Sequence, residues 1–129
     1  MKLLITGAFS ATAEQLDMLS SLGLEIMLQK DERGVPECDF SEADAVICNG
    51  LFLYHDISEF KKLKFIQLTS AGLDRVPLDE IRKRNIALFN ARGVYSVPMA
   101  ELALAGTLSL YKHLNTFSEN QKAHMWQKD

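Results

Sequence analysis

Two loops carry the residues whose types and spacing best suit the binding of a small anion. Ser70-Ala71-Gly72 combines small side chains with a glycine, so consecutive backbone N–H groups can approach a carboxylate closely. Asn49-Gly50-Leu51 offers a side-chain amide and backbone N–H groups, although a structural turn explains this segment equally well. Arg92 could pair with an anion, but an arginine in a loop is more often simply solvated. Each of these signals is weak when taken alone.

A third loop, from Gly7 to Thr12, could hold a phosphate because small residues and hydroxyl groups precede the start of a predicted helix. Ser10 and Thr12 would provide the contacts. A turn followed by a helix cap is the more ordinary explanation, since Thr12 and Gln15 match a capping box.

The histidines and cysteines predict neither a metal site nor a nucleophile. His55, His113 and His124 fall in a loop, on a helix and in a polar tail, without a partner at ligand or catalytic spacing. Cys38 and Cys48 form no CxxC motif, so we expect both to be free thiols. We therefore predict no catalytic residue and no metal ligand in this chain.

Composition narrows the range of partners. The 129 residues are 47% apolar and carry a formal net charge of −3, which suits one globular domain and offers no general basic surface for nucleic acid or an anionic membrane. The apolar runs are too short to span a bilayer, and the N-terminal residues lack a signal-peptide layout. We expect a cytoplasmic protein.

Five short apolar runs that lack strict alternation predict buried parallel strands. They cover residues 3–6, 24–28, 44–48, 64–69 and 86–90. Helical patterns follow at residues 12–22, 57–63 and 77–84, the first with Leu16, Leu19 and Leu22 facing inward. This alternation predicts an α/β fold with a flavodoxin-like, doubly wound parallel sheet of about five strands in the order 2-1-3-4-5.

A long helix is predicted from Val97 to Phe117, with Ser96 as its cap and Pro98 in its first turn. Apolar residues lie on two of its faces, which indicates a second partner such as another domain or another subunit. Gly106 inside it suggests a close packing contact. We expect a domain at residues 1–96, an interface helix with a polar tail at 97–129, and a sequence that stops in mid-protein.

The segment Lys64 to Asp74, the following run Ile86 to Asn90, and Ala100-Glu101 at the start of a helix together resemble the D-isomer-specific 2-hydroxyacid dehydrogenases. The resemblance is strong from Lys64 to Leu110, weak from Met1 to Leu63, and includes a closing aromatic at Trp126. It implies the N-terminal part of a flavodoxin-like substrate-binding domain.

The resemblance also implies roles for the loops. Ser70, Ala71 and Gly72 would present N–H groups to the carboxylate of a 2-hydroxy or 2-oxo acid, opposite the Asn49-Gly50-Leu51 loop. Ala71 and Ser96 would lie near the nicotinamide of NAD or NADP in the full-length enzyme.

The sequence departs from the family in lacking a GxGxxG motif. The family's Rossmann cofactor domain and its catalytic arginine, glutamate and histidine all belong to later segments. We therefore expect this chain alone to be inactive and to bind no cofactor tightly. From the apolar faces of the long helix we expect a homodimer through residues 98–117. The alternative is a free-standing flavodoxin-like module that binds a phosphate or a flavin through Ser10 and Thr12.

Overall fold

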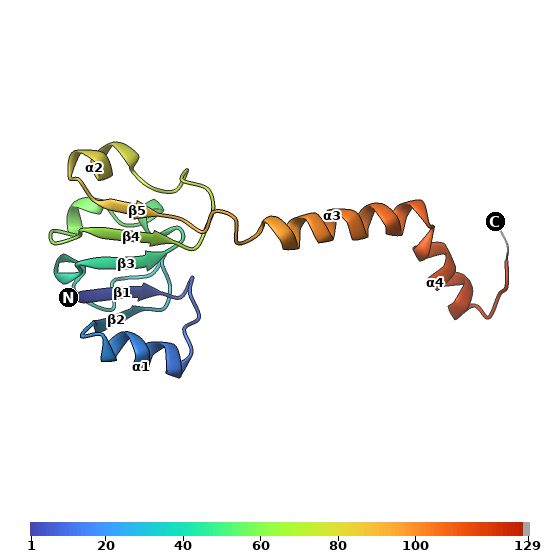
Figure 1. Ribbon diagram of the computed structural model, residues 1–129, viewed down its shortest axis with the longest axis horizontal. Helices are drawn as coiled ribbons and strands as arrows, with labels where there is room; N and C mark the ends of the chain where they lie inside the picture. Colours follow the sequence, from blue (N-terminus) through green and yellow to red (C-terminus); the bar gives the residue numbers. More distant parts are fainter. Residues whose placement is uncertain (128–129) are drawn as a thin grey trace. The chain divides into compact units, whose positions relative to one another are not determined.

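Five parallel strands form one sheet in the order β2-β1-β3-β4-β5 in a computed structural model that describes residues 1–127 (Figure 1). The strands are β1 (Lys2–Thr6), β2 (Glu25–Gln29), β3 (Ala45–Cys48), β4 (Phe65–Leu68) and β5 (Ala87–Phe89). The order confirms the predicted α/β sheet. Because every strand runs the same way, the loops after the strands meet at one edge.

The sheet has an apolar core on each face because neighbouring strand residues point to opposite sides. Leu4, Val46 and Ile66 lie on one face and are fully buried beneath the segments that connect β3, β4 and β5. Leu3, Ile5 and Ala45 lie on the other face. Thus the same short runs supply both halves of the core.

Helix α1 (Ala13–Ser21) covers the second face. Its capping box is present: the Thr12 hydroxyl accepts the N–H of Gln15, whose side chain accepts the N–H of Thr12. Leu16 and Leu19 pack on the core as predicted. The prediction for Leu22 is wrong, because this residue is the C-cap and is exposed.

The predicted helix at 57–63 is a single 3-10 turn, η3 (Ile57–Glu59). Phe60 leaves the helical backbone with φ −90° and ψ 76°, and its ring is fully buried against Phe40 with centroids 4.8 Å apart. Core packing of an aromatic side chain therefore ends this helix. Two further 3-10 turns, η1 (Phe40–Glu42) and η2 (Leu51–Leu53), lie in the loops around β3. The prediction for 77–84 corresponds to α2 (Leu78–Lys83).

The chain divides into two compact units, Met1–Arg92 and Gly93–Asp129. The second unit holds α3 (Ser96–Tyr111) and α4 (Leu114–Lys122). The prediction of one helix up to Phe117 is wrong, because His113 has φ 52° and this left-handed residue separates the two helices. Ser96 is the first helical residue and Tyr95 is the cap position. A methyl group added at Gly106 would meet nothing within 4 Å, so the expected packing contact is absent from the described residues.

Candidate functional site

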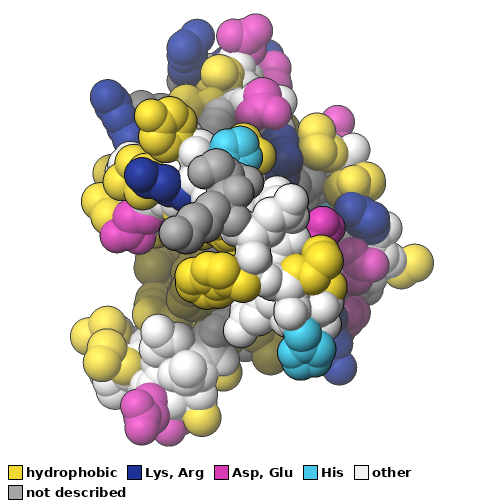
Figure 2. All heavy atoms as spheres, turned by 90° about the vertical axis from the view of Figure 1, so that its right-hand side faces the viewer, with side chains coloured by type: hydrophobic (Ala, Val, Ile, Leu, Met, Phe, Trp, Pro, Cys, Tyr) yellow, Lys and Arg dark blue, Asp and Glu magenta, His cyan; other side chains and the backbone are white. Residues whose placement is uncertain are grey.

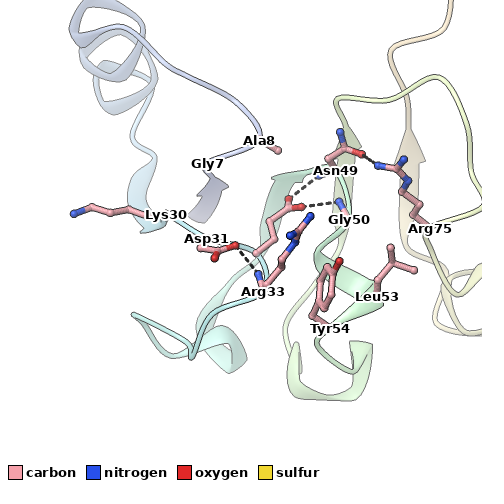
Figure 3. Close-up of a pocket in the computed structure, with 11 residues that line it drawn as sticks. Gly7, Ala8, Lys30, Asp31, Arg33, Asn49, Gly50, Leu53, Tyr54 and Arg75 are labelled. Atoms are coloured by element: carbon pink, nitrogen blue, oxygen red, sulfur yellow. Dashed lines mark hydrogen bonds between the residues drawn. The ribbon is translucent and has the colours of Figure 1, made fainter.

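A cavity of about 520 Å³ opens at the edge where β1, β2 and β3 end (Figure 3). Gly7 belongs to its wall and must be a glycine, because a Cβ atom there would lie 2.0 Å from the carbonyl oxygen of Lys30. The loops after β1 and β2 therefore approach each other closely. The cavity is lined by Gly7, Ala8, Lys30, Asp31, Glu32, Arg33, Asn49, Gly50, Leu53, Tyr54 and Arg75.

The carboxylate of Glu32, which follows β2, accepts hydrogen bonds from the ends of β1 and β3 in this cavity. One oxygen accepts the hydroxyl of Thr6 at 2.6 Å and the N–H of Asn49 at 2.7 Å. The other oxygen accepts the N–H of Gly50 at 2.7 Å (Figure 3). The N–H groups of the predicted Asn49-Gly50 site are therefore already used inside the protein.

Arg75 joins the loops after β3 and β4. Its Nη1 donates to Oδ1 of Asn49 at 2.8 Å (Figure 3). These loops begin side by side, since Cys48 pairs with Leu68 in the sheet. The structure thus brings Asn49 into contact with the segment that follows Ser70-Ala71-Gly72.

Three cationic side chains line the cavity: Lys30, Arg33 and Arg75. Within residues 1–127, none of them forms an ion pair. The guanidinium carbon of Arg33 lies 5.8 Å from the ring centroid of Tyr54, which is within cation–π range. The carboxylates of Asp31 and Glu32 line the same cavity, so three cations and two anions give the lining a formal net charge of +1.

The Ser70-Ala71-Gly72 loop is held through its carbonyl groups. Asn90 Nδ2 donates to the Ala71 oxygen at 2.7 Å, and the Ala91 N–H donates to the Ser70 oxygen at 2.9 Å. The Ser70 hydroxyl donates to the Gly72 oxygen at 3.1 Å. In the described part of the chain, no hydrogen bond uses the backbone N–H of Ser70, Ala71 or Gly72. These three donors are available to a ligand.

Other predicted site residues lie apart from this cluster. The Leu51 side chain is fully buried in the core, so only its backbone could line a pocket. Arg92 is exposed, and its N–H donates to Asn90 Oδ1. Ser96 belongs to the second unit. Thr12 serves α1 as its N-cap, which agrees with the turn-and-cap explanation of the first loop.

The residues that sequence reasoning missed come mainly from the loop after β2. Lys30, Glu32 and Arg33 follow β2 directly, and Arg75 follows the Ser70 loop. The rule that ligands bind beyond the carboxyl ends of parallel strands points to this loop as well, and its run of charged residues is the signal in the sequence that could have identified it.

The cysteines and His55 are not among the residues that line this cavity. Cys38 and Cys48 are free thiols, as predicted, and burial raises the pKa of both. His55 packs its ring edge-on against Phe40 at 5.0 Å. Among the described residues, no group of three His, Cys, Asp or Glu side chains could hold a metal ion. None of the helices described is long and apolar enough to cross a membrane.

A family model for the D-isomer specific 2-hydroxyacid dehydrogenase catalytic domain matches residues 8–128 of the chain. The chain belongs to this family. Among curated proteins, the hydroxypyruvate reductase of Thermotoga maritima is 29% identical to it over 104 residues, which make up 78% of this chain and 33% of that protein.

Solved structures agree with the family assignment. A D-isomer specific 2-hydroxyacid dehydrogenase family protein from Aeromonas salmonicida is 26% identical and aligns with a TM-score of 0.72 over 99% of this chain and 41% of its own. The D-lactate dehydrogenase of Aquifex aeolicus, solved with NAD and lactic acid, has a TM-score of 0.77 at 22% identity and shows the same fold over 98% of this chain and 39% of its own. The chain therefore spans about two fifths or less of the length of these relatives.

Proposed function

We propose that this chain forms the N-terminal part of the substrate-binding domain of an NAD(P)-dependent D-2-hydroxyacid dehydrogenase. The observation that carries the proposal is the Ser70-Ala71-Gly72 loop, whose carbonyl groups accept hydrogen bonds while its three N–H groups donate none within residues 1–127. Consecutive N–H donors of this kind suit the carboxylate of a 2-hydroxy or 2-oxo acid. The Asn49-Gly50-Leu51 loop would form the opposite wall.

The chain's part in the reaction is to bind and orient the acid. A bound nicotinamide supplies or accepts hydride in such enzymes, and Ala71 and Ser96 would lie near it. The residues present do not form a cofactor site of their own, since the sequence has no glycine-rich dinucleotide motif. We therefore expect the chain alone to hold the acid weakly, to bind no NAD(P) tightly and to catalyse no turnover. Two free thiols are consistent with a cytoplasmic enzyme.

Titration of the ¹⁵N-labelled chain with pyruvate and D-lactate, followed by NMR, tests this function. We expect the amide signals of Ser70, Ala71 and Gly72 to shift with a Kd on the order of 1 mM, since a few hydrogen bonds to one carboxylate give only about 4 kcal/mol. Lactamide, which lacks the carboxylate charge, is the matched control and should shift them far less. Binding of NADH below about 10 µM, or unchanged Ser70–Gly72 signals with every acid, would overturn the proposal.

A second copy of the chain is the partner that we propose for α3. Its apolar side chains are exposed on more than one face, including Val97, Met99, Leu102, Leu104, Leu108, Leu110 and Tyr111. Hydrophobic side chains, in yellow, are visible at the surface in Figure 2. Exposure of this kind favours a homodimer through the region of residues 98–117. Light scattering should give twice the chain mass, and a monomer at all concentrations would contradict this partner.

A further inference from the structure

Glu32 is bound by the protein as a carboxylate ligand would be. Its two oxygens accept one hydroxyl and two backbone N–H groups, at 2.6 Å from Thr6 and at 2.7 Å from both Asn49 and Gly50. Short hydrogen bonds to an ionised acceptor are among the stronger ones in proteins. Two consecutive N–H groups converging on one carboxylate form an anion-binding nest.

This carboxylate is half-buried and, among the residues that the structure describes, has no cationic partner. Glu32 forms no ion pair within residues 1–127, although Lys30, Arg33 and Arg75 line the same cavity. A solvent-exposed acidic side chain gains little from a fixed geometry, whereas a half-buried one must have its oxygens satisfied. The N–H groups of the Asn49 loop donate hydrogen bonds to those oxygens, and the same bonds hold the loop in place.

Fixing this loop affects the proposed substrate wall. The N–H of Asn49 is held by Glu32, and the side-chain oxygen of Asn49 accepts Arg75 Nη1 at 2.8 Å. Arg75 follows the Ser70-Ala71-Gly72 loop by a few residues. A continuous chain of hydrogen bonds therefore runs from the loop after β2, through the loop after β3, to the loop after β4.

We propose that Glu32 positions the wall of the substrate pocket. Its carboxylate fills a receptor made of the Thr6 hydroxyl and the N–H groups of Asn49 and Gly50, and thereby holds the Asn49 loop in place. This inference rests on the proposed function in one respect only: the acid bound at Ser70–Gly72 is the ligand whose affinity Glu32 supports. The receptor itself is independent of that function. Once the Glu32 side chain is removed, the receptor binds a small external carboxylate.

The test compares Glu32→Ala with the wild-type chain by ¹⁵N NMR. We expect faster hydrogen exchange at the amides of Asn49 and Gly50, and a roughly tenfold weaker Kd for pyruvate, the size typical of losing a group that orients a binding residue. Added formate should shift the Asn49 and Gly50 amides of the variant toward their wild-type positions. Because formate also competes for the Ser70–Gly72 N–H groups, the pyruvate affinities of variant and wild type are compared at equal formate concentration, where the difference between them should shrink. A merely structural role would lower the free energy of unfolding without changing the pyruvate Kd of the folded variant.

Glu37→Ala is the matched control, because Glu37 lies in the same loop and, within residues 1–127, its side chain accepts a single hydrogen bond, from the backbone N–H of Lys30 at 3.2 Å. It should leave the Asn49 and Gly50 amides unchanged and show no response to formate. Glu32→Gln keeps the side-chain volume but replaces one acceptor oxygen with a donor, so it should fold even if Glu32→Ala does not. We expect faster exchange at Asn49 or Gly50 in this variant too.

The outcomes separate the two proposals. If Glu32→Ala and Glu32→Gln both leave Asn49 and Gly50 exchange at wild-type rates, or if formate shifts neither amide, the inference is overturned. If wild-type chain fails to bind any 2-oxo acid while formate still enters the variant's receptor, the proposed function fails and the receptor stands.

Discussion

The two units of this chain are both rich in apolar residues, yet only the first buries them. In Met1–Arg92, side chains such as Leu4, Val46 and Ile66 are fully buried because alternate strand positions face a covered side of the sheet. In the 16-residue helix α3, whose only charged residue is Glu101, no residue is buried. Apolar content therefore does not by itself make a core: the apolar residues must face a surface that the same unit provides.

This difference has a consequence for the second unit. An isolated helix of about 15 residues is only marginally stable in water, and most helices in proteins owe their stability to a packed face. Among the described residues, α3 and α4 bury none of their side chains. The helical state of this unit should therefore depend on a partner, which agrees with the proposed pairing of two copies.

The same substitution made in each unit gives the largest expected contrast. Leu4→Ala removes a fully buried side chain from the core and should lower the free energy of unfolding by about 2–5 kcal/mol, through lost burial and the cavity left behind. Leu104→Ala, at a residue 61% exposed, should change it by less than about 0.5 kcal/mol. Urea denaturation at low protein concentration measures both.

Measuring both variants over a range of protein concentrations makes this comparison more decisive. If α3 pairs with a second copy, Leu104→Ala should become destabilising as the concentration rises, because the partner then buries the side chain. Leu4→Ala should cost the same at every concentration. Equal effects of the two substitutions at low concentration would show that the first unit alone does not account for the stability of the chain.

The first unit was also the more predictable from sequence. The strand order followed from five buried runs, and the cap of α1 followed from Thr12 and Gln15, because local chemistry and tertiary packing agree at these positions. The helix predicted at 57–63 failed because burial of the Phe60 ring overrides its local helical pattern. Glu32 was missed because a nest of N–H groups from a distant loop leaves no spacing signal in the sequence.

Threonine offers a smaller contrast between the units. Thr12→Ala removes the hydroxyl that accepts the Gln15 N–H at the start of α1 and should destabilise the first unit by about 1 kcal/mol. Thr107 lies inside α3, where its hydroxyl donates to the Ala103 oxygen at 2.8 Å. Thr107→Ala should slightly increase helicity, because alanine has the higher helix propensity and the competing side-chain bond is lost. Far-UV circular dichroism and urea denaturation distinguish these results; destabilisation by both would contradict the contrast.

The smallest expected difference between the two units is in how the free energy of unfolding depends on acidic pH. The pKa of Asp44 is lowered, first by the hydrogen bond that its Oδ2 accepts from the Lys2 N–H at 2.8 Å and then by the charge of Lys64. A carboxyl group with a lowered folded-state pKa contributes stability above its unfolded pKa of about 4, and that stability is lost as the pH falls through the folded value. Asp44→Asn should therefore flatten the decline in first-unit stability below about pH 4. Glu101→Gln is the control, because the Glu101 carboxylate of α3 has no hydrogen bond or ion pair within residues 1–127. It should leave the decline unchanged. An equal response to both substitutions would show that net charge, rather than the Asp44 contact, governs acid unfolding.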